Sequence, residues 1–432
     1  MIIEFSVSNF RSIGKKQTIS FVAAKGDDSL PENVIHDTEP KLLKSIGIYG
    51  PNASGKSNII RALGVMKSIV INSATVKPDV EKPIQSFKLD QTLHLLPTEF
   101  EIIFIHNNIR YQYGFVTTKT TVLEEWLIAY PKGYGQTWFR RFHDKKNDEV
   151  IFNPGPFLKG EKKRLQKLTR TDSLFLSVAA HFGNKQLKDI YNWFKEYFFV
   201  IFDESLDNLP DTELQFSWMH NKDKGLGYLK SVILRYIQNA DLGIADIRIR
   251  KSDIDVSDIT FPDNTPEDVK HDIRNRLKEN PPVSIRTVHK IPGTEDEVLF
   301  NIEDESDGTQ RFIELLGPWL WTKFKKATLI VDEIESGLHP LLTRELIKLI
   351  HNESENSPSP QLLFTTHDVT LLSNDLLRRD QIWFVEKDEK QESVLTPLTD
   401  YSPRNKEALL KGYMSGRYRA IPNLDDFGKD ET

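Results

Sequence analysis

The chain has 432 residues, of which 38% are hydrophobic and 28% charged, which is typical of a globular protein with two or three domains. It has no Cys, so disulfides, thiolate metal sites and a cysteine nucleophile are excluded. The net charge of −6 does not attract the whole chain to nucleic acid, and such binding would need a local basic face.

The N-terminal segment Met1–Phe5 has no basic residues and does not resemble a secretory signal. No uncharged run approaches the about 20 apolar residues that a membrane span needs. We therefore expect a cytoplasmic protein that does not contact membranes.

Apolar residues alternate with polar ones over 2–7 and 17–22, which predicts two strands joined by the turn Asn9–Gly14. Further along, Ile46–Tyr49 is a short apolar strand. It runs directly into a glycine-rich loop and then a helix that reaches about Lys67.

The next part of the chain is predicted to be β-rich, with a hairpin turn at Asn107-Asn108. A mainly helical region follows. The sequence shows no internal repeat and no sustained heptad pattern. Residues 246–300 mix short strands with a proline-rich stretch. The expected strands lie at 100–105, 111–116 and 123–130, and the expected helices at 159–180, 186–201 and 227–240.

From residue 306 the α/β pattern returns. A polar turn opens an apolar helix over 306–321, and Ala327–Val331 is a continuous apolar run typical of a buried parallel strand. The remaining expectations are a helix over 340–353, strands over 361–366 and 381–386, and a loop-rich end.

The segment Gly50–Ser57 matches the eight-residue P-loop pattern and lies between a strand and a helix. In this motif, backbone N–H groups surround phosphates, the lysine reaches the outer phosphates and the serine reaches Mg²⁺. The alternative is a chance glycine turn before a helix. The predicted nucleotide contacts are Asn52, Ala53, Ser54, Gly55, Lys56, Ser57 and Asn58.

The apolar strand ending at Val331 is followed by two carboxylates, Asp332 and Glu333. Such acids lie at the edge of a parallel sheet where ligands bind. We predict that Asp332 holds Mg²⁺ together with Ser57, and that Glu333 polarises the attacking water. The alternative is a solvated acidic turn, and we interpret the nearby Glu335 as a turn residue.

Two further positions are candidates for contact with phosphate. His367 follows a buried strand and could hydrogen-bond a γ-phosphate, although a lone histidine is usually structural. The turn Ser306–Gln310 opens a helix, whose N-terminus suits an anion, so Ser306 and Gly308 are candidate ATP contacts. Its alternative is an ordinary N-cap, which Ser306 alone could supply.

The stretch Lys159–Arg170 is rich in lysine and arginine and could bind nucleic acid. A charge run of this kind is more often a solvated helix face.

Together these motifs resemble the ABC-type ATPases, which include transporter subunits, the SMC, RecF and Rad50-like proteins and the OLD-like nucleases. Ser306–Gln310 looks like their signature turn, Ser336–Pro340 like their D-loop and Thr366–Asp368 like their switch histidine. The opening Ile3–Ile13, with its Asn-Phe-Arg-Ser turn, resembles the RecF and SMC branch. In that branch the arginine touches nucleotide, which makes Arg11 a candidate ligand.

A finer resemblance is to bacterial stand-alone "AAA family ATPase" proteins of the RloA and abortive-infection type. It implies an ATPase that uses ATP and Mg²⁺ and gates or senses for an effector encoded nearby, often nuclease-like, in anti-phage defence. It rests on five segments: Ser86–Asp90, Tyr111–Phe115, Leu123–Leu127, Ser173–Ser177 and Gly412–Tyr418.

The resemblance implies an α/β fold, an ABC-type head with an N-terminal β subdomain and a compact insertion. ATP would lie between two protomers of a head-to-tail homodimer or a higher homo-oligomer. We expect four segments: an N-terminal lobe (1–70), a β-rich part (71–155), a mainly helical insertion (156–300) and a C-terminal lobe (301–432).

Two residues depart from the family pattern. Asp307 replaces a glycine of the signature turn, so its side chain should point away from phosphate. The expected loop glutamine is not obvious, with Gln85 as a candidate and an exposed loop amide as the alternative.

Three other functions compete with the defence ATPase. The first is a RecF-like DNA-repair ATPase. A transporter subunit fits poorly, because that class lacks the Asn-Phe-Arg-Ser turn and the long insertion. A nuclease also fits poorly, because no second acidic cluster follows the core strands.

Overall fold

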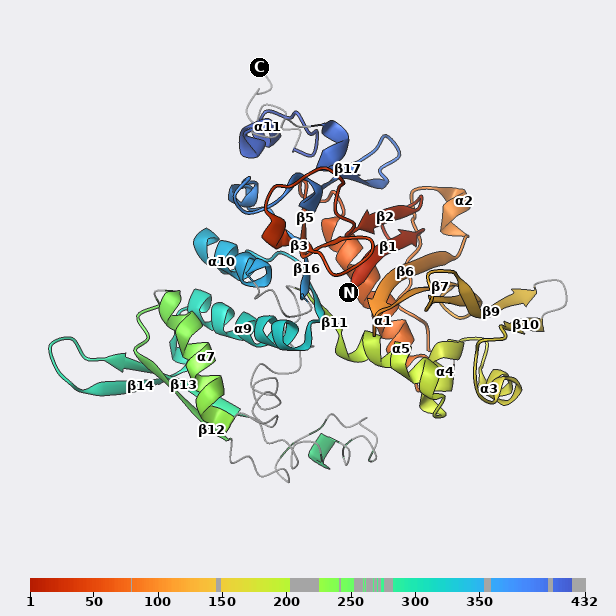
Figure 1. Cartoon of the computed structure of the whole chain (residues 1–432), viewed down its shortest axis with the longest axis horizontal. Coiled ribbons are helices and arrows are strands. Elements are labelled where there is room, and N and C mark those ends of the chain that lie inside the picture. Colours follow the sequence, from red (N-terminus) through yellow and green to blue (C-terminus); the bar gives the residue numbers. More distant parts are fainter. Residues whose placement is uncertain are drawn as a thin grey trace, which may run out of the picture. The chain divides into compact units, whose positions relative to one another are not determined.

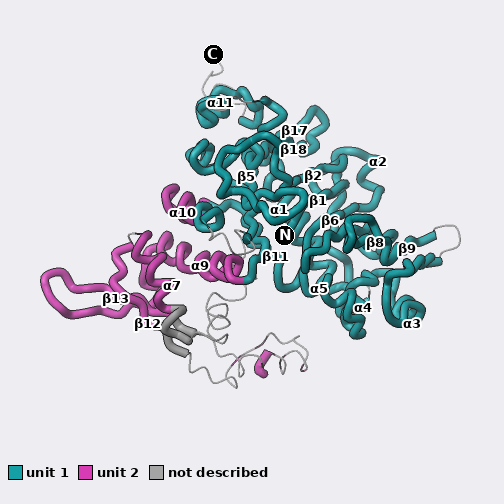
Figure 2. Tube along the Cα trace, viewed as in Figure 1, with its two compact units in different colours: residues 1–203, 325–334, 347–432 teal, residues 204–324, 335–346 magenta. Residues whose placement is uncertain are grey.

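A computed structural model gives the structure of the chain (Figure 1). It describes residues 1–78, 80–144, 149–202, 225–240, 242–251, 283–352, 359–402 and 407–421, with a few single positions between 259 and 275. The chain forms two compact units, coloured separately in Figure 2. Unit 1 comprises residues 1–203, 325–334 and 347–432, and unit 2 comprises residues 204–324 and 335–346.

A six-stranded sheet forms the centre of unit 1. Five of its strands are parallel and the sixth, at one edge, is antiparallel. The central strands are mostly apolar, with polar residues only at their ends, and every residue in them is buried, as expected for parallel strands covered on both faces. In spatial order the strands are β11 (Phe198–Ile201), β15 (Thr328–Val331), β16 (Gln361–Thr365), β5 (Ser45–Tyr49), β17 (Ile382–Lys387) and β18 (Ser393–Pro397).

A seven-stranded antiparallel sheet forms the second layer of unit 1. Its inner strand β6 (Thr98–His106) alternates buried and half-buried side chains, and a hairpin at Asn107 and Asn108, both at positive φ, joins β6 to β7 (Ile109–Thr117). In spatial order the strands are β10 (Glu149–Pro154), β9 (Gln136–Asp144), β8 (Val122–Tyr130), β7, β6, β1 (Ile2–Ser8) and β2 (Gln17–Ser20).

Helices of unit 1 connect and cover these sheets. The long α1 (Lys56–Asn72) follows β5, and the others are α3 (Lys162–Leu168), α4 (Phe175–His181), α5 (Lys185–Glu196), α2 (Gln91–His94) and α11 (Leu409–Met414). The smaller elements in the described part of unit 1 are the strand pair β3 (Val34–Ile35) and β4 (Leu42–Leu43) and the 3-10 turns at Pro31–Asn33, Val369–Leu371, Arg379–Gln381 and Leu398–Tyr401.

A buried carboxylate ties β8 to the start of α4. Glu125 is fully buried and accepts hydrogen bonds from the backbone N–H groups of Phe175 (2.7 Å) and Leu176 (3.0 Å). It also pairs with the buried Arg141 at 3.1 Å and accepts from the hydroxyl of Tyr113. This network gives the segments Leu123–Leu127 and Ser173–Ser177 a structural role.

Unit 2 contains helix α7 (Gly225–Asn239), the antiparallel sheet β12 (Asp246–Lys251), β13 (Val283–Lys290) and β14 (Glu297–Asn301), the turn at Ile302–Asp304 and most of α9 (Asp307–Lys325). Helix α10 (Pro340–His351) begins in unit 2 and ends in unit 1. None of the helices in the described part of the chain has the length and apolar character needed to cross a membrane.

Several expected elements differ from the structure. Residues 186–201 are not one helix, because α5 ends at Glu196 and β11 follows it into the central sheet. The helix expected over 159–180 is two helices, interrupted at Thr169–Leu174. Strands β9, β10 and β18 were not expected. The proline-rich positions Pro262, Pro266, Pro281 and Pro282 lie outside the described residues.

Candidate functional site

The glycine loop between β5 and α1 has a shape that only glycine allows at two positions. Gly50 and Gly55 have φ of 156° and 108°. A Cβ on Gly55 would lie 2.1 Å from Ser393 Oγ, and one on Gly50 would lie 2.3 Å from the carbonyl oxygen of Val385. Both glycines are therefore required by space as well as by backbone conformation.

The polar groups of this loop suit an anion. Helix α1 begins at Lys56, and no side chain caps its N-terminus. The Lys56 ammonium donates to the carbonyl oxygens of Gly50 (2.7 Å) and Pro51 (3.2 Å). Ser54 is buried, and its hydroxyl has no hydrogen-bond partner among the described residues. A buried hydroxyl of this kind is costly without a partner, and a phosphate oxygen would supply one.

The loop rests on residues from both ends of the chain. Ser393, at the start of β18, donates its hydroxyl proton to the carbonyl oxygen of Ser54 at 2.6 Å, and its hydroxyl oxygen lies 2.8 Å from the hydroxyl of Ser12. The amide of Asn58 also donates to Ser12, at 2.7 Å. The Asn58 side chain therefore points to the Asn9–Gly14 turn, and the contact with nucleotide expected for Asn58 remains a prediction.

The turn before Ser12 is held by a second set of bonds. Asn9 and Arg11 both have positive φ. The Asn9 amide donates to the carbonyl oxygens of Leu93 and Leu96, each at 2.7 Å, and the Arg11 N–H donates to that of Gln85 at 2.6 Å. Arg11 is thus one residue from the serine that contacts the glycine loop, whereas the Gln85 side chain is exposed.

The predicted acidic turn follows β15, and β16 separates β15 from β5. Because these strands are parallel, Asp332, the end of β16 and the glycine loop all lie at one edge of the sheet. Asp332 is 5% exposed, and its Oδ1 accepts from the hydroxyl of Thr365 at 2.6 Å. Glu333 is half-buried and has a positive φ of 51°.

His367 lies just beyond the end of β16, at the same edge of the sheet, and its side chain is exposed. The next residue, Asp368, caps the turn Val369–Leu371 by accepting from the N–H of Thr370 at 2.9 Å. The structure thus brings the predicted histidine to the edge that carries Asp332 and Glu333.

The residues that would hold magnesium offer oxygen donors. Ser57 lies in the first turn of α1, and Asp332 lies at the same sheet edge. Mg²⁺ prefers such oxygens and commonly takes one or two protein ligands together with substrate phosphates. The described residues contain no group of three or more His, Asp or Glu side chains that could hold a metal.

A match to a known protein family identifies the class of protein that carries this sheet edge. Residues 45–373, well over half of the chain, match the family described as "AAA domain, putative AbiEii toxin, Type IV TA system". The chain belongs to this family. The expected ABC/SMC-type P-loop ATPase with an α/β fold is thereby confirmed, and this AAA family implies nucleotide binding and, as a rule, magnesium.

Solved structures similar to this AAA-domain chain include two SMC heads. The SMC head bound to the C-winged helix domain of ScpA is 15% identical with a TM-score of 0.39, over 91% of this chain and 96% of that one. The SMC head domain from Thermotoga maritima is 14% identical with a TM-score of 0.38, over 92% and 98%. No curated protein matches the chain.

The signature-like turn belongs to unit 2, whereas the P-loop belongs to unit 1. The Ser306 hydroxyl accepts from the N–H of Thr309 at 3.3 Å, which makes Ser306 the N-cap of α9. A Cβ on Gly308 would lie 3.1 Å from the carbonyl oxygen of Gly337, in the D-loop-like segment. Asp307 is exposed.

Sequence reasoning missed three residues of this site. The Asn-Phe-Arg-Ser turn pointed to Arg11, but the contact with the glycine loop comes from Ser12. Ser393 carried no local signal, because its partner Ser12 is 381 residues away along the chain. Thr365 does lie beside the switch-histidine motif, and a polar residue ending a buried strand was the available clue.

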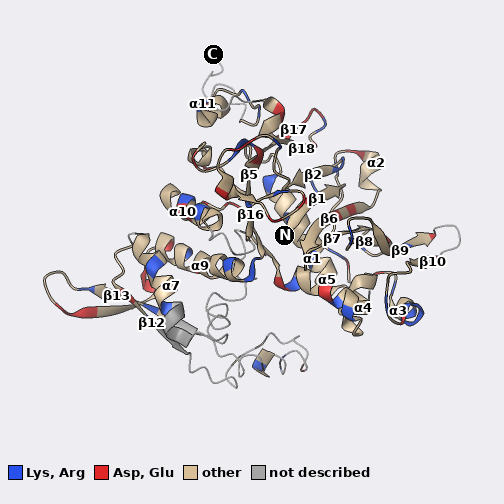
Figure 3. Ribbon diagram, in the orientation of Figure 1, with Lys and Arg blue, Asp and Glu red and all other residues tan. Residues whose placement is uncertain are grey.

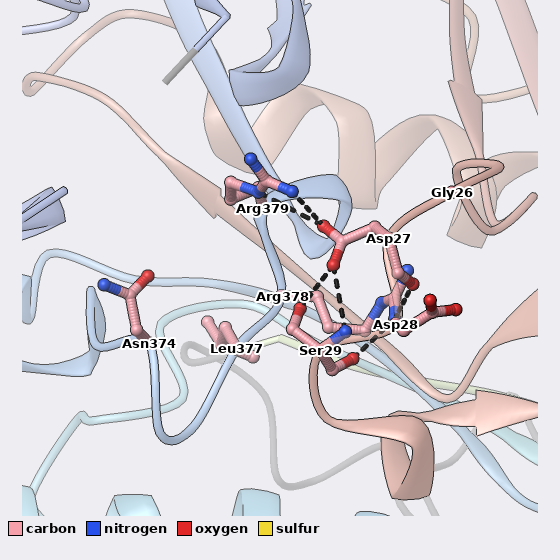
Figure 4. Close-up of a pocket in the computed structure, with 8 residues that line it drawn as sticks. All are labelled: Gly26, Asp27, Asp28, Ser29, Asn374, Leu377, Arg378 and Arg379. Carbon is pink, nitrogen blue, oxygen red and sulfur yellow. Dashed lines mark hydrogen bonds and ion pairs between the residues drawn. The ribbon is translucent and has the colours of Figure 1, made fainter. Parts of the chain in front are cut away.

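A separate pocket of about 270 Å³ lies between residues 26–29 and 374–379 (Figure 4). Its arginines are already paired, because Arg379 contacts the Asp27 carboxylate at 2.8 Å and Arg378 contacts Asp380 at 2.8 Å. Burial opposes ionisation of Asp27, but the Ser29 hydroxyl and Arg379 outweigh it and lower the pKa of Asp27. The Arg379–Asp27 pair joins the N-terminal loop to the segment before β17, whereas the Arg378–Asp380 pair lies within that segment.

Proposed function

We propose that the protein is an Mg²⁺-dependent ATPase whose output is a change of conformation. The observation that carries this proposal is the path of the chain through the acidic turn. Residues 325–334, which include Asp332 and Glu333, belong to unit 1, but the chain belongs to unit 2 on both sides of them. The acidic turn is therefore joined to unit 2 through the backbone on both sides. A movement of the turn when ATP binds or is hydrolysed would act directly on unit 2.

The residues at the sheet edge have distinct proposed roles. Lys56 and the N–H groups of the loop bind the phosphates, and Ser57 and Asp332 would hold magnesium, which neutralises phosphate charge. Glu333 accepts a proton from the attacking water. His367 and Arg11 would hydrogen-bond the γ-phosphate as its charge changes.

We further propose that ATP lies between two protomers arranged head to tail. Ser306 and Gly308 of one protomer would complete the site that the P-loop of the other begins, which gives two equivalent sites. ATP binding then favours the closed dimer, and hydrolysis favours the open state.

Light scattering of two variants tests this arrangement. Glu333→Gln should bind ATP without cleaving it and should accumulate as a dimer. Lys56→Ala should remain monomeric with ATP. If both variants stay monomeric at saturating ATP, the dimer proposal fails even if the wild type hydrolyses ATP.

The proposed biological role is to gate or sense for an effector, often nuclease-like, in anti-phage defence in the cytoplasm. Its support is the family description, which names a toxin and a toxin–antitoxin system. The neighbouring gene is the most informative observation. A small nuclease or reverse-transcriptase gene next to this one supports the role, and a replication-gene cluster contradicts it.

A second candidate is a nucleic-acid-dependent ATPase, which a basic and aromatic surface of unit 1 favours. The loop before α3 is fastened to the α4–α5 turn, since the Asn184 amide donates to the carbonyl oxygen of Lys159 at 2.8 Å. Phe157 and Phe182, on these two segments, are 45% and 60% exposed. Figure 3 shows basic residues on α3, and the exposed ones on these segments are Lys159, Lys163, Arg164, Lys167, Lys185 and Lys188.

Exposed aromatic rings among cations suit single-stranded nucleic acid, whose bases stack on the rings. Anisotropy with labelled oligothymidine should detect binding that weakens steeply with salt. Lys163→Glu and Phe182→Ala should each weaken it, whereas Lys132→Glu, an exposed lysine on the β8–β9 loop, should not. An ATPase rate unchanged by the oligonucleotide would rule this candidate out.

A further inference from the structure

One threonine, Thr365, hydrogen-bonds both acids of the turn, Asp332 and Glu333, and the residue that follows them, Ile334. The Thr365 hydroxyl donates to Asp332 Oδ1 at 2.6 Å and accepts from the N–H of Glu333 at 2.8 Å. The Thr365 carbonyl oxygen accepts from the N–H of Ile334 at 3.1 Å. Thr365 is fully buried, so water does not compete for these bonds.

The bond to Glu333 matters because of that residue's backbone. Glu333 has a φ of 51°, which is uncommon for a residue other than glycine and costs free energy unless its surroundings hold it. The bond from its N–H to Thr365 is one restraint that keeps this conformation. The direction in which the Glu333 carboxylate leaves the turn depends on the same backbone angles.

The bond to Asp332 fixes the other carboxylate. Asp332 Oδ1 accepts a hydrogen bond from the Thr365 hydroxyl, so the Asp332 carboxylate cannot rotate without losing this short bond. A single side chain therefore orients both acids, and it does so from the strand that lies between them and the P-loop strand.

We propose that Thr365 is a positioning residue for ATP hydrolysis, which sets the orientation of Asp332 and Glu333 without touching the substrate. The proposal rests on the proposed ATPase function. It predicts that the threonine hydroxyl contributes to turnover more than to ATP binding, because the P-loop supplies most of the binding contacts and the acidic turn supplies the chemistry.

The test compares steady-state kinetics of wild type, Thr365→Val and Thr365→Ser. Thr365→Val keeps the shape and removes the hydroxyl, so kcat should fall about 10- to 100-fold while KM for ATP changes by less than about threefold. The valine variant should also need more Mg²⁺ for half-maximal rate, because Asp332 is no longer oriented. Thr365→Ser restores the hydroxyl and should recover most of kcat.

Thr328→Val is the matched control. Thr328 is also fully buried, lies on the neighbouring strand β15, and hydrogen-bonds a side chain, Gln361, at 3.3 Å. It lies at the opposite end of the strand from the acidic turn, so its valine variant should keep the wild-type kcat. If Thr365→Val does not fold, Thr365→Ala removes the same hydroxyl and takes its place.

Three results would overturn the proposal: a wild-type kcat in the hydroxyl-free variant, an equal loss in Thr365→Ser, or an equal loss in Thr328→Val. Failure of the ATPase function looks different, because the wild-type protein itself would then not hydrolyse ATP.

Discussion

At the scale of single residues, the glycine loop depends on contacts that a side chain would destroy. Gly55 combines a φ of 108° with a wall made of Ser393 and Ser12, whose hydroxyl oxygens lie 2.1 and 2.6 Å from the position of an added Cβ. Elsewhere, Gly133 has a similar φ of 82° but nothing within 4 Å. An alanine at Gly133 would add backbone strain alone, whereas an alanine at Gly55 would add both backbone strain and a steric clash. Comparing the two positions therefore separates these two costs.

Gly55→Ala should lower the free energy of unfolding by about 2–4 kcal/mol, because a strained φ and an overpacked contact add together. It should also abolish binding of a fluorescent ATP analogue, since Ser393 must move away from the loop. Gly133→Ala should cost about 1 kcal/mol and leave binding intact. Urea unfolding and analogue titration measure both. Equal effects in the two variants would mean that the Ser393 contact is unimportant.

The P-loop and the acidic turn could be predicted because each is a contiguous motif whose chemistry sets the residue types. Ser393 could not, because its contact with Ser54 joins residues 339 positions apart. Thr365 could not either, since nothing in the sequence states that β16 lies between β5 and β15. The register between parallel strands, rather than any local pattern, brings these groups together.

At the scale of elements, apolar periodicity predicted the long strands and α1 but not where one element changes into another. The stretch 186–201 has aromatic residues on both sides of the boundary between helix and strand, and only the pairing of Phe198–Ile201 with β15 makes its end a strand. That partner lies 130 residues further along the chain. The same limit applies to β18, whose short and partly polar sequence has no strong strand signal.

The end of α10 contacts the start of β5 through a buried histidine. His351 is 3% exposed, and its Nε2 lies 2.8 Å from the hydroxyl of Ser45. That hydroxyl also accepts from the amide of Gln381 at 2.8 Å, and its second lone pair and its proton leave either direction open for the bond to the imidazole. Burial, helped by the charge of Lys44, lowers the pKa of His351 to about 3.

Because the unfolded chain binds this proton near pH 6.5 and the folded chain does not, stability is lost as the pH falls below about 6.5. His351 should account for about 2 kcal/mol of the loss between pH 7 and pH 5. Urea unfolding across this range should show a shallower decline for His351→Gln, which cannot become charged. Parallel declines in the two proteins would mean that His351 is protonated in the folded state.

At the scale of the whole molecule, the two compact units divide the predicted site residues between them. The predicted segments 1–70 and 71–155 lie in unit 1, and the signature-like turn lies in unit 2. The division of the chain into four segments remains a prediction. Whether Ser306 serves the P-loop of its own chain or that of a second copy decides whether the protein works alone or as a dimer.

Mixing two inactive variants distinguishes these cases. Lys56→Ala removes the phosphate-binding lysine, and Ser306→Asp keeps an N-cap for α9 but places a negative charge where it would repel the γ-phosphate. Each variant alone should be inactive.

In a head-to-tail dimer, the mixed pair contains one intact site, formed by the P-loop of the Ser306→Asp chain and the turn of the Lys56→Ala chain. An equal mixture should therefore recover a measurable part of the wild-type ATPase rate, equal to about a quarter where the subunits pair at random. If the turn acts within its own chain, no mixed pair contains an intact site and the mixture stays inactive. Ser306→Ala, which removes the cap without adding charge, shows how much of the loss comes from the helix itself.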